Sequence, residues 1–178
     1  GDRVLEVGYG SLGWLADLMG LGLRCFDLHG IELDSTRAEA AKAAFPSADL
    51  RVGDAAEMPW ADDMFKLVVV STVMTSILDN EVRQAVADEV DRVLEPGGAV
   101  LWYDFRVDNP ANPNVRGISR GELKKLFPGM ARHVRRVTLA PPLARRIAPV
   151  SLTAATLLAR LPFLRPHLLG VLVLANAE

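Results

Sequence analysis

Short apolar runs alternate with amphipathic stretches along the first half of this chain. Apolar runs of roughly 4–8 residues bounded by turn residues are typical of buried strands, whereas apolar residues at helical spacing are typical of helices that cover a sheet. Because the two patterns alternate, we expect an α/β fold with a parallel sheet and helices on both faces. Strands are predicted over 3–8, 28–33, 48–52, 67–70 and 99–103. Helices are predicted over 12–19, from Asp34 or Ser35 to Phe45-Pro46, and from Asp79 to Pro96-Gly97-Gly98.

The second half of the chain carries fewer regular signals. Ser119 and Glu122 have the spacing of a capping box, in which each side chain accepts a hydrogen bond from the other residue's backbone N–H. They predict a short helix that ends at Pro128-Gly129. Two further strands are predicted near 133–140 and 168–175.

Residues 141–166 form an apolar insertion between these last two strands. A helix is predicted over about 150–160, and Pro162 breaks it. The stretch is too short, and too often interrupted by Arg160 and by prolines, to span a bilayer. No transmembrane segment is therefore expected.

Length and composition fit one ordinary domain over residues 1–178. Half of the residues are apolar, which is enough for a sizeable core. Cys25 is the only cysteine and can form no internal disulfide, which fits a reducing, cytoplasmic location. The sequence begins at the first strand, without a Met or a preceding helix, and this predicts that an N-terminal segment is missing.

The net charge of −2 hides a division of the chain. Residues 1–108 contain 9 Lys/Arg and 20 Asp/Glu, whereas residues 109–178 contain 11 and 2. We interpret the basic half as solvated surface that also pairs with the acidic half. An acidic substrate, a nucleic acid or a membrane surface are the alternatives. No nucleic acid is expected as a partner, because no aromatic residues interleave these arginines as a stacking platform requires.

A glycine-rich turn follows the first predicted strand, within Val4-Leu5-Glu6-Val7-Gly8-Tyr9-Gly10-Ser11-Leu12-Gly13. Gly8 and Gly10 allow dihedrals that other residues avoid, and the N-terminus of the following helix offers free N–H groups to an anion. The turn therefore predicts a cofactor cradle. Turns of this shape hold the pyrophosphate of dinucleotides and also the amino-acid end of S-adenosylmethionine, so the turn alone does not choose between these cofactors.

Three more motifs follow the turn in order, and together the series resembles the class I S-adenosylmethionine-dependent methyltransferases. The four motifs are Glu6-Val7-Gly8-Tyr9-Gly10, Gly30-Ile31-Glu32, Gly53-Asp54-Ala55 and Leu94-Glu95-Pro96-Gly97-Gly98. The resemblance implies a Rossmann-like sheet of seven strands whose last strand is antiparallel. It also places the cofactor above the carboxyl ends of the first four strands.

The resemblance implies S-adenosylmethionine as the cofactor and roles for the residues that match the motifs. A planar carboxylate at Glu32 is suited to accept two charge-assisted hydrogen bonds from ribose hydroxyls. Asp54 is similar to the family's acceptor for the adenine amino group, and Glu6 would reach the amino group of the methionine portion. The full set of expected cofactor-binding residues is Glu6, Gly8, Gly10, Glu32, Leu33, Asp54, Ala55 and Ser71.

The family's chemistry is a direct displacement in which a nucleophile of the methyl acceptor attacks the methyl carbon. The protein contributes alignment, exclusion of water and sometimes a base. Asp104, directly after the fifth predicted strand, is the first candidate for the base, with Tyr103 as a positioning group. The three histidines are interpreted as structural, and no metal site is expected because no cluster of His, Cys and Asp has ligand spacing.

The insertion over 141–166 is longer than a hairpin between the last two strands requires. We expect it to form a wall of the acceptor site and to select an apolar small molecule, with arginines such as Arg145 and Arg146 holding an anionic group at its margin. The alternative is that its helix only covers the sheet edge or a dimer contact, as apolar helical stripes commonly do.

Two other functions are compatible with parts of the sequence. Gly8, Gly10 and Gly13 match the glycine spacing of NAD(P)-dependent oxidoreductases, and Glu32 stands near the offset of a ribose-binding acid. A degenerate scaffold without catalysis is the third hypothesis, because Leu12 replaces a glycine and Tyr9 replaces a small residue in the turn. Both replacements predict a crowded cradle.

Overall fold

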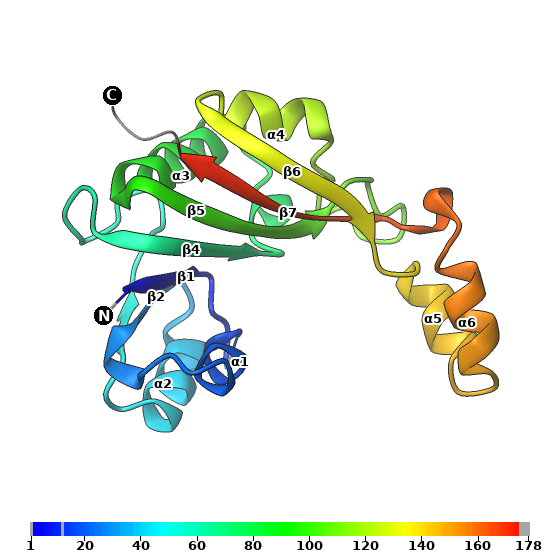
Figure 1. Ribbon diagram of the computed structural model, residues 1–178, viewed down its shortest axis with the longest axis horizontal. Coiled ribbons are helices and arrows are strands. Elements are labelled where there is room, and N and C mark those ends of the chain that lie inside the picture. The colour runs from blue at the N-terminus through cyan, green and yellow to red at the C-terminus, as the bar shows by residue number, and fades with distance from the viewer. Residues whose placement is uncertain (1, 12, 175–178) are drawn as a thin grey trace.

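The sheet contains five neighbouring parallel strands, followed at one edge by one antiparallel strand and by a last strand that runs in the same direction as the first five. The structure is a computed structural model that describes residues 2–11 and 13–174. Within these residues the strand order is β3-β2-β1-β4-β5-β7-β6, and β7 pairs antiparallel with both β5 and β6 (Figure 1). The strands are β1 (Val4–Val7), β2 (Leu28–Glu32), β3 (Asp49–Val52), β4 (Phe65–Ser71), β5 (Leu94–Phe105), β6 (Met130–Val137) and β7 (His167–Leu174). The expected seven-stranded sheet with an antiparallel last strand is confirmed.

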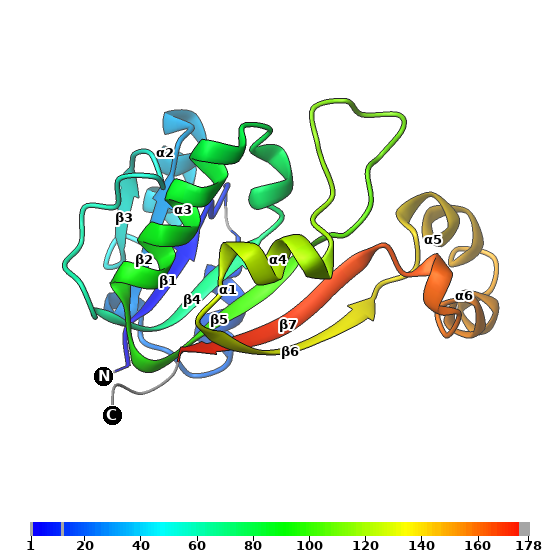
Figure 2. The same cartoon turned by 90° about the horizontal axis from the view of Figure 1, so that it is seen from above.

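Helices cover both faces of the sheet, as Figure 2 shows from above. Apolar side chains of α1 and α2 pack on one face, and those of α3 and α4 pack on the other, so the sheet has a core on each side. The helices of this part are α1 (Leu15–Gly20), α2 (Ser35–Ala44), α3 (Asn80–Val93) and α4 (Arg120–Leu126). Short 3-10 turns are η1 (Cys25–Asp27), η2 (Met74–Ser76) and η3 (Pro162–Leu164).

Side-chain caps fix where three of these helices begin. Asp34 accepts hydrogen bonds from the backbone N–H groups of the first turn of α2, and Asp79 does the same for α3. Ser119 and Glu122 form the predicted capping box of α4. Each cap satisfies N–H groups that have no partner inside the helix, which is worth about 1 kcal/mol.

The predicted bounds of two strands in the sheet are wrong. α3 ends at Val93, and β5 begins at Leu94 rather than at residue 99. Leu94 is buried and pairs with Phe65, after which the register shifts, so the Pro96-Gly97-Gly98 segment forms an irregularity inside the strand. β6 begins three residues before its predicted start and ends before Thr138, whose positive φ of 63° turns the chain out of the sheet.

The apolar insertion forms a helical hairpin instead of the single helix predicted over 150–160. α5 (Pro141–Ile147) and α6 (Leu152–Leu158) pack against each other and project away from the sheet (Figure 1). Pro141 and Pro142 stand in the first turn of α5, where proline is tolerated because no N–H partner is lost. None of the helices in the described residues is long and apolar enough to cross a membrane.

Candidate functional site

A cavity of about 670 Å³ opens at the carboxyl ends of β1 to β4. Its size falls within the usual range of small-molecule sites, and the carboxyl edge is where open α/β sheets bind ligands. Its walls come from the glycine-rich turn, the ends of β2, β3 and β4, and the start of α3. All eight residues expected to bind the cofactor line this cavity: Glu6, Gly8, Gly10, Glu32, Leu33, Asp54, Ala55 and Ser71.

The glycine-rich turn needs glycine for two different reasons. Gly8 and Gly10 have φ values of +67° and +58°, in the region that other residues avoid. A Cβ on Gly8 would lie 2.5 Å from Cγ2 of Val73, whereas a Cβ on Gly10 would meet nothing within 4 Å. Gly8 therefore permits both the turn and a close approach to the segment after β4, and Gly10 permits only the turn.

Glu6 lies almost fully buried beneath this turn. Both of its carboxylate oxygens are 2.9 Å from the backbone nitrogen of Trp14, which donates to them from the start of α1. Burial raises the pKa of Glu6 from 4.5 to about 7, although the Trp14 hydrogen bond opposes the shift. Within the described residues no cationic side chain lies within 4.0 Å of this carboxylate.

Glu32 stands at the end of β2 with its carboxylate oriented by two backbone donors. Gly10 N–H donates to Oε2 at 2.8 Å, and Asp34 N–H donates to Oε1 at 3.0 Å. A carboxylate offers about four lone-pair positions, so each oxygen retains capacity for a ligand hydroxyl. The same contacts tie Glu32 to the glycine-rich turn, so one side chain both shapes the cradle and faces the cavity.

Asp54 lies at the mouth of the cavity in the turn after β3. Its Oδ1 accepts a hydrogen bond of 2.9 Å from the backbone N–H of Ala56, which holds the carboxylate in place. Leu33, which follows the neighbouring strand β2, is largely exposed and adds an apolar surface to the cavity. An acid and an apolar side chain at this position can hold a flat heterocycle that carries a hydrogen-bond donor.

Tyr9 does not crowd the cradle as expected. Its ring is fully buried in the core on the α1 and α2 face of the sheet, and its hydroxyl donates to the backbone oxygen of Arg51 at 3.2 Å. Gly30 makes room for this ring, because a Cβ on Gly30 would collide with it. Leu12, the other replacement, lies outside the described residues.

Asp104 does not line the cavity, and its expected role as a general base does not fit its surroundings. It is fully buried, and its carboxylate accepts hydrogen bonds from the hydroxyl of Thr75 at 2.6 Å, the N–H of Thr75 at 3.1 Å and the N–H of Phe105 at 2.8 Å. Burial raises the pKa of Asp104, and these hydrogen bonds oppose the shift. The hydrogen bonds with Thr75 hold η2 against the end of β5.

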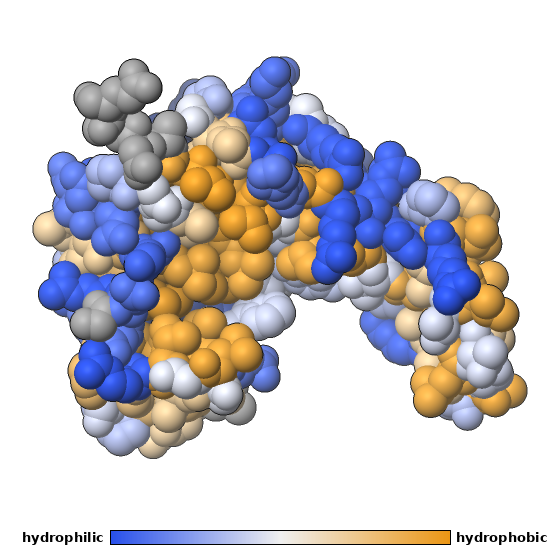
Figure 3. Space-filling view, viewed as in Figure 1, coloured by the Kyte–Doolittle hydropathy of each residue, from blue (hydrophilic) through white to orange (hydrophobic). Residues whose placement is uncertain are grey.

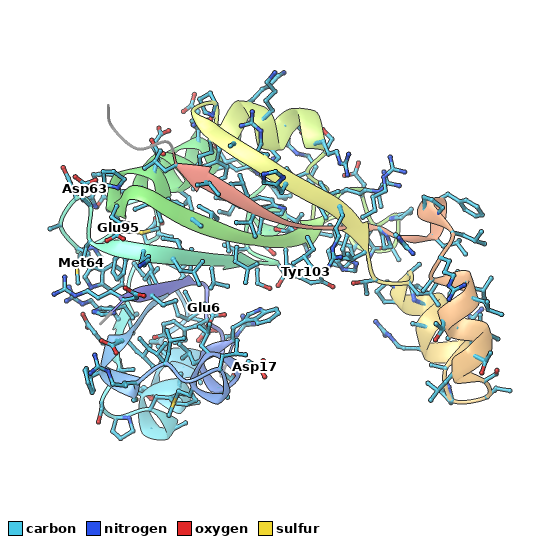
Figure 4. The ribbon with its side chains drawn as sticks, viewed as in Figure 1. Glu6, Asp17, Asp63, Met64, Glu95 and Tyr103 are labelled. Carbon is cyan, nitrogen blue, oxygen red and sulfur yellow. The ribbon has the colours of Figure 1, made fainter. Side chains whose placement is uncertain are left out.

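Tyr103 lies one strand away from the cavity. It pairs with Ser71, which lines the cavity, and Figure 4 shows it at the same edge of the sheet as Glu6. Its ring stacks on His167 with centroids 4.9 Å apart, and its hydroxyl is 3.1 Å from Oγ1 of Thr138. Tyr103 therefore connects the cavity side of β5 with the base of the hairpin formed by α5 and α6.

Further residues line the cavity beside the eight expected ones. Thr72, directly after β4, has φ +56°, which is rare for a β-branched residue and marks a strained turn at the cavity. No sequence signal predicts this conformation. Ile77, Val82 and Val86 form an apolar wall of the cavity, and Val82 and Val86 recur at the helical spacing of α3.

The basic and acidic halves of the chain are not joined by ion pairs, contrary to expectation. Every salt bridge among the described residues lies within residues 1–108. The same residues contain no group of three His, Cys, Asp or Glu side chains placed to hold a metal ion. Among the arginines of the second half, Arg120, Arg132 and Arg165 donate hydrogen bonds to backbone carbonyls instead of pairing with carboxylates.

The sheet order and the cavity at its carboxyl edge define an α/β domain that binds a nucleoside cofactor. The model of the methyltransferase domain family matches residues 4–98, which is more than half of the chain. The chain belongs to the class I S-adenosylmethionine-dependent methyltransferases.

Relatives and solved structures agree with this assignment. A demethylmenaquinone methyltransferase of Mycolicibacterium paratuberculosis is 28% identical over 134 residues, which cover 75% of this chain and 54% of that protein. A protein of Mycolicibacterium smegmatis named as an S-adenosylmethionine-dependent methyltransferase is 31% identical, covering 71% of this chain and 50% of its own length. The chain thus spans about half the length of these relatives. A methyltransferase structure from Methanosarcina mazei superposes with a TM-score of 0.74 at 18% identity, covering 99% of this chain and 93% of that one.

The cavity residues fit S-adenosylmethionine, the cofactor of this family. Among the described residues no cationic side chain lies within 4.0 Å of the buried Glu6 carboxylate, and an ammonium group of a ligand would compensate its charge. Glu32 keeps free acceptor capacity for a diol, and Leu33 and Ala55 offer apolar surface to a ring. Gly8 and Gly10 permit the turn whose backbone lines the cavity beside these side chains.

Proposed function

We propose that this domain binds S-adenosylmethionine in the cavity and transfers its methyl group to a hydrophobic small molecule. The observation that carries the proposal is the convergence of Glu6, Glu32 and Asp54 on one cavity from the ends of three different strands. Three carboxylates in this arrangement provide separate acceptors for an ammonium group, a diol and an amino group. An oxidoreductase site requires only the second of them.

The cofactor, when bound, supplies a methyl group on a positively charged sulfonium. The residues of the chain then act by binding and alignment. Glu32 and Asp54 fix the two ends of the nucleoside, and the Gly8 turn sets the depth of the methionine portion. Holding reactants in a reactive geometry supplies up to about 7–11 kcal/mol of the barrier, so a positioned base is not required for an acceptor whose nucleophile is already reactive.

The acceptor side of the proposal rests on apolar surface. Val73, Ile77, Val82 and Val86 line the cavity on the side of α3. Figure 3 shows a hollow between the body of the domain and the hairpin of α5 and α6. The hairpin does not line the cavity itself, so its proposed role is to flank the route by which a hydrophobic acceptor reaches the cavity. Several relatives are named for demethylmenaquinone, and we take from their names a small-molecule acceptor.

Calorimetric titration of the chain with S-adenosylmethionine, NADH and NADPH tests the cofactor. We expect binding of S-adenosylmethionine alone. Glu32→Gln should weaken this binding by about 1.5–3 kcal/mol, the scale of a hydrogen bond to a charged group. Glu57→Gln is the matched control, because Glu57 is an exposed carboxylate outside the cavity.

Three results would contradict the proposal. Binding of NADH in place of S-adenosylmethionine would restore the oxidoreductase hypothesis. Absence of binding by the folded chain would favour the degenerate scaffold. Unchanged affinity in a folded Glu32→Gln variant would remove Glu32 from the site.

A further inference from the structure

The hairpin formed by α5 and α6 carries cations that the domain does not neutralise. Residues 131–174 contain seven arginines and no Asp or Glu. Arg145, Arg146 and Arg160 are exposed on the hairpin. Among the residues that the structure describes, none of these three has a carboxylate oxygen within 4.0 Å. The hairpin is therefore complementary to an anionic partner.

The same hairpin exposes large apolar side chains beside these arginines. Val150 is 87% exposed, Leu152 74%, Phe163 71% and Leu157 56%. No residue of α5, α6 or η3 is buried, and Figure 3 shows apolar surface along the free end of the hairpin. An exposed apolar cluster of this kind on a projecting element marks an interaction surface.

We propose that this hairpin docks the domain on the surface of an anionic lipid bilayer. Amphipathic helices with arginine on one side and Leu or Phe on the other lie at the boundary between headgroups and acyl chains. The arginine stems pack along the apolar layer while their guanidinium groups meet anionic headgroups. A bilayer surface thus accommodates both the charge and the apolar side chains of the hairpin.

Other partners account for only part of this surface. A nucleic acid would neutralise the arginines, but it would leave Val150 and Leu152 without an apolar contact, and Phe163 is the hairpin's only aromatic residue for stacking. A second copy of the chain offers the acidic residues of its first half to the arginines. It would bury the apolar residues only in an ordered dimer, which sedimentation detects.

Docking through the hairpin would bring the hollow beside the cavity close to the membrane, because the hairpin borders this hollow (Figure 3). A hydrophobic acceptor would then enter from the bilayer without crossing water. This consequence rests on the proposed function, whereas docking itself does not require that any methyl group be transferred.

Co-sedimentation of the chain with lipid vesicles tests the charge contribution. The vesicles contain phosphatidylcholine with or without phosphatidylglycerol, and no cofactor is added. We expect binding only with phosphatidylglycerol, and weaker binding at higher salt. The Arg145→Gln/Arg146→Gln variant should bind about 25-fold more weakly, since each basic residue contributes about fivefold. Lys124→Gln/Lys125→Gln, a matched pair in the last turn of α4, should bind like wild type.

A second pair of variants tests the apolar contribution. Leu152→Ser/Phe163→Ser should reduce binding by about tenfold or more for each side chain removed from the membrane. Leu21→Ser/Phe26→Ser changes the same residue types at exposed positions of the body and should leave binding unchanged. Thermal unfolding checks that all variants fold, and their affinity for S-adenosylmethionine is measured separately.

Three results would overturn the proposal. The first is a folded wild-type chain that does not sediment with phosphatidylglycerol vesicles. The second is binding that the hairpin variants and the control variants change equally. The third is a concentration-dependent dimer that Leu152→Ser/Phe163→Ser abolishes, without vesicle binding, which would assign the hairpin to a second copy. Failure to bind S-adenosylmethionine would leave each of these readouts unchanged, so the two proposals fail separately.

Discussion

Replacing Gly8 by alanine should destabilise the domain and damage the cofactor cradle. A residue with a Cβ at φ +67° costs about 1–2 kcal/mol in the left-handed region. The new Cβ would also lie 2.5 Å from Cγ2 of Val73, and overpacking of this kind costs about 1–3 kcal/mol. The free energy of unfolding should therefore fall by about 2–5 kcal/mol. For a chain of this length the midpoint of thermal unfolding should fall by on the order of 10 °C.

Gly10→Ala separates the two costs. Gly10 has a similar φ of +58°, but a Cβ there would meet no atom within 4 Å. Only the conformational cost of about 1–2 kcal/mol should remain. Adding Val73→Ala to Gly8→Ala should recover about 1–3 kcal/mol through relief of the collision, which a double-mutant cycle measures as a coupling energy.

The assay for these variants is urea unfolding followed by calorimetric titration with S-adenosylmethionine. Gly8→Ala should weaken binding more than Gly10→Ala does, because relieving the collision displaces the turn from the segment after β4. Equal destabilisation of the two variants, with no coupling between Gly8 and Val73, would refute the reasoning. The turn would then be free to move away from Val73 at no cost.

Three further predictions concern the contributions of two buried carboxylates and one helix cap to stability. Burial raises the pKa of Glu6 to about 7, so the contribution of Glu6 to stability is full below pH 4.5 and is lost as the pH rises through 7. Between pH 5 and pH 8, the free energy of unfolding of wild type, measured in urea, should fall by roughly 2–3 kcal/mol relative to that of Glu6→Gln. Parallel pH profiles of the two proteins would contradict this prediction. Asp104→Asn and Thr75→Val should each lower the free energy of unfolding by about 1–3 kcal/mol, and a double-mutant cycle should show that the two changes are coupled. An Asp104→Asn variant that loses methyl transfer at unchanged stability would instead support the role of Asp104 as a base. Ser119→Ala should lower the free energy of unfolding by about 1 kcal/mol, measured by thermal unfolding, and Ser119→Asp should retain most of the wild-type stability. An alanine variant as stable as wild type would show that the capping box with Glu122 adds nothing measurable.

Most of the fold could be predicted from local patterns. Buried parallel strands appear as short apolar runs, so the positions of β1, β2, β3 and β4 follow from the sequence to within a few residues. The start of β5 was misplaced because Pro96-Gly97-Gly98 has the composition of a turn. In the folded chain Leu94 already pairs with Phe65, and the glycines are absorbed in an irregular part of the strand.

The cofactor side of the site was more predictable than the catalytic side. Glu32 and Asp54 directly follow strands, and parallel strands bring their carboxyl ends to one edge, so their meeting in one cavity depends only on strand order. The direction of a side chain at a strand end is harder to infer. Tyr103 and Asp104 are neighbours in the sequence, but side chains alternate between the two faces of a strand. Tyr103 therefore contacts Thr138 at the base of the hairpin, whereas Asp104 contacts Thr75 of η2.

The sequence by itself determined the class of fold, the family and the eight expected cofactor-binding residues that meet at the cavity, because apolar periodicity and glycine turns act over short distances. Only the tertiary structure decided which acids are free to act. Asp104 is buried and accepts hydrogen bonds from Thr75, whereas Glu6 is buried but lines the cavity. Tyr9 points into the core, where Gly30 leaves room for its ring. It also decided that the apolar insertion folds on itself and stands away from the sheet, leaving its apolar and basic side chains exposed. Burial, hydrogen-bond partners and exposure are properties of residues distant in sequence, so local patterns cannot specify them.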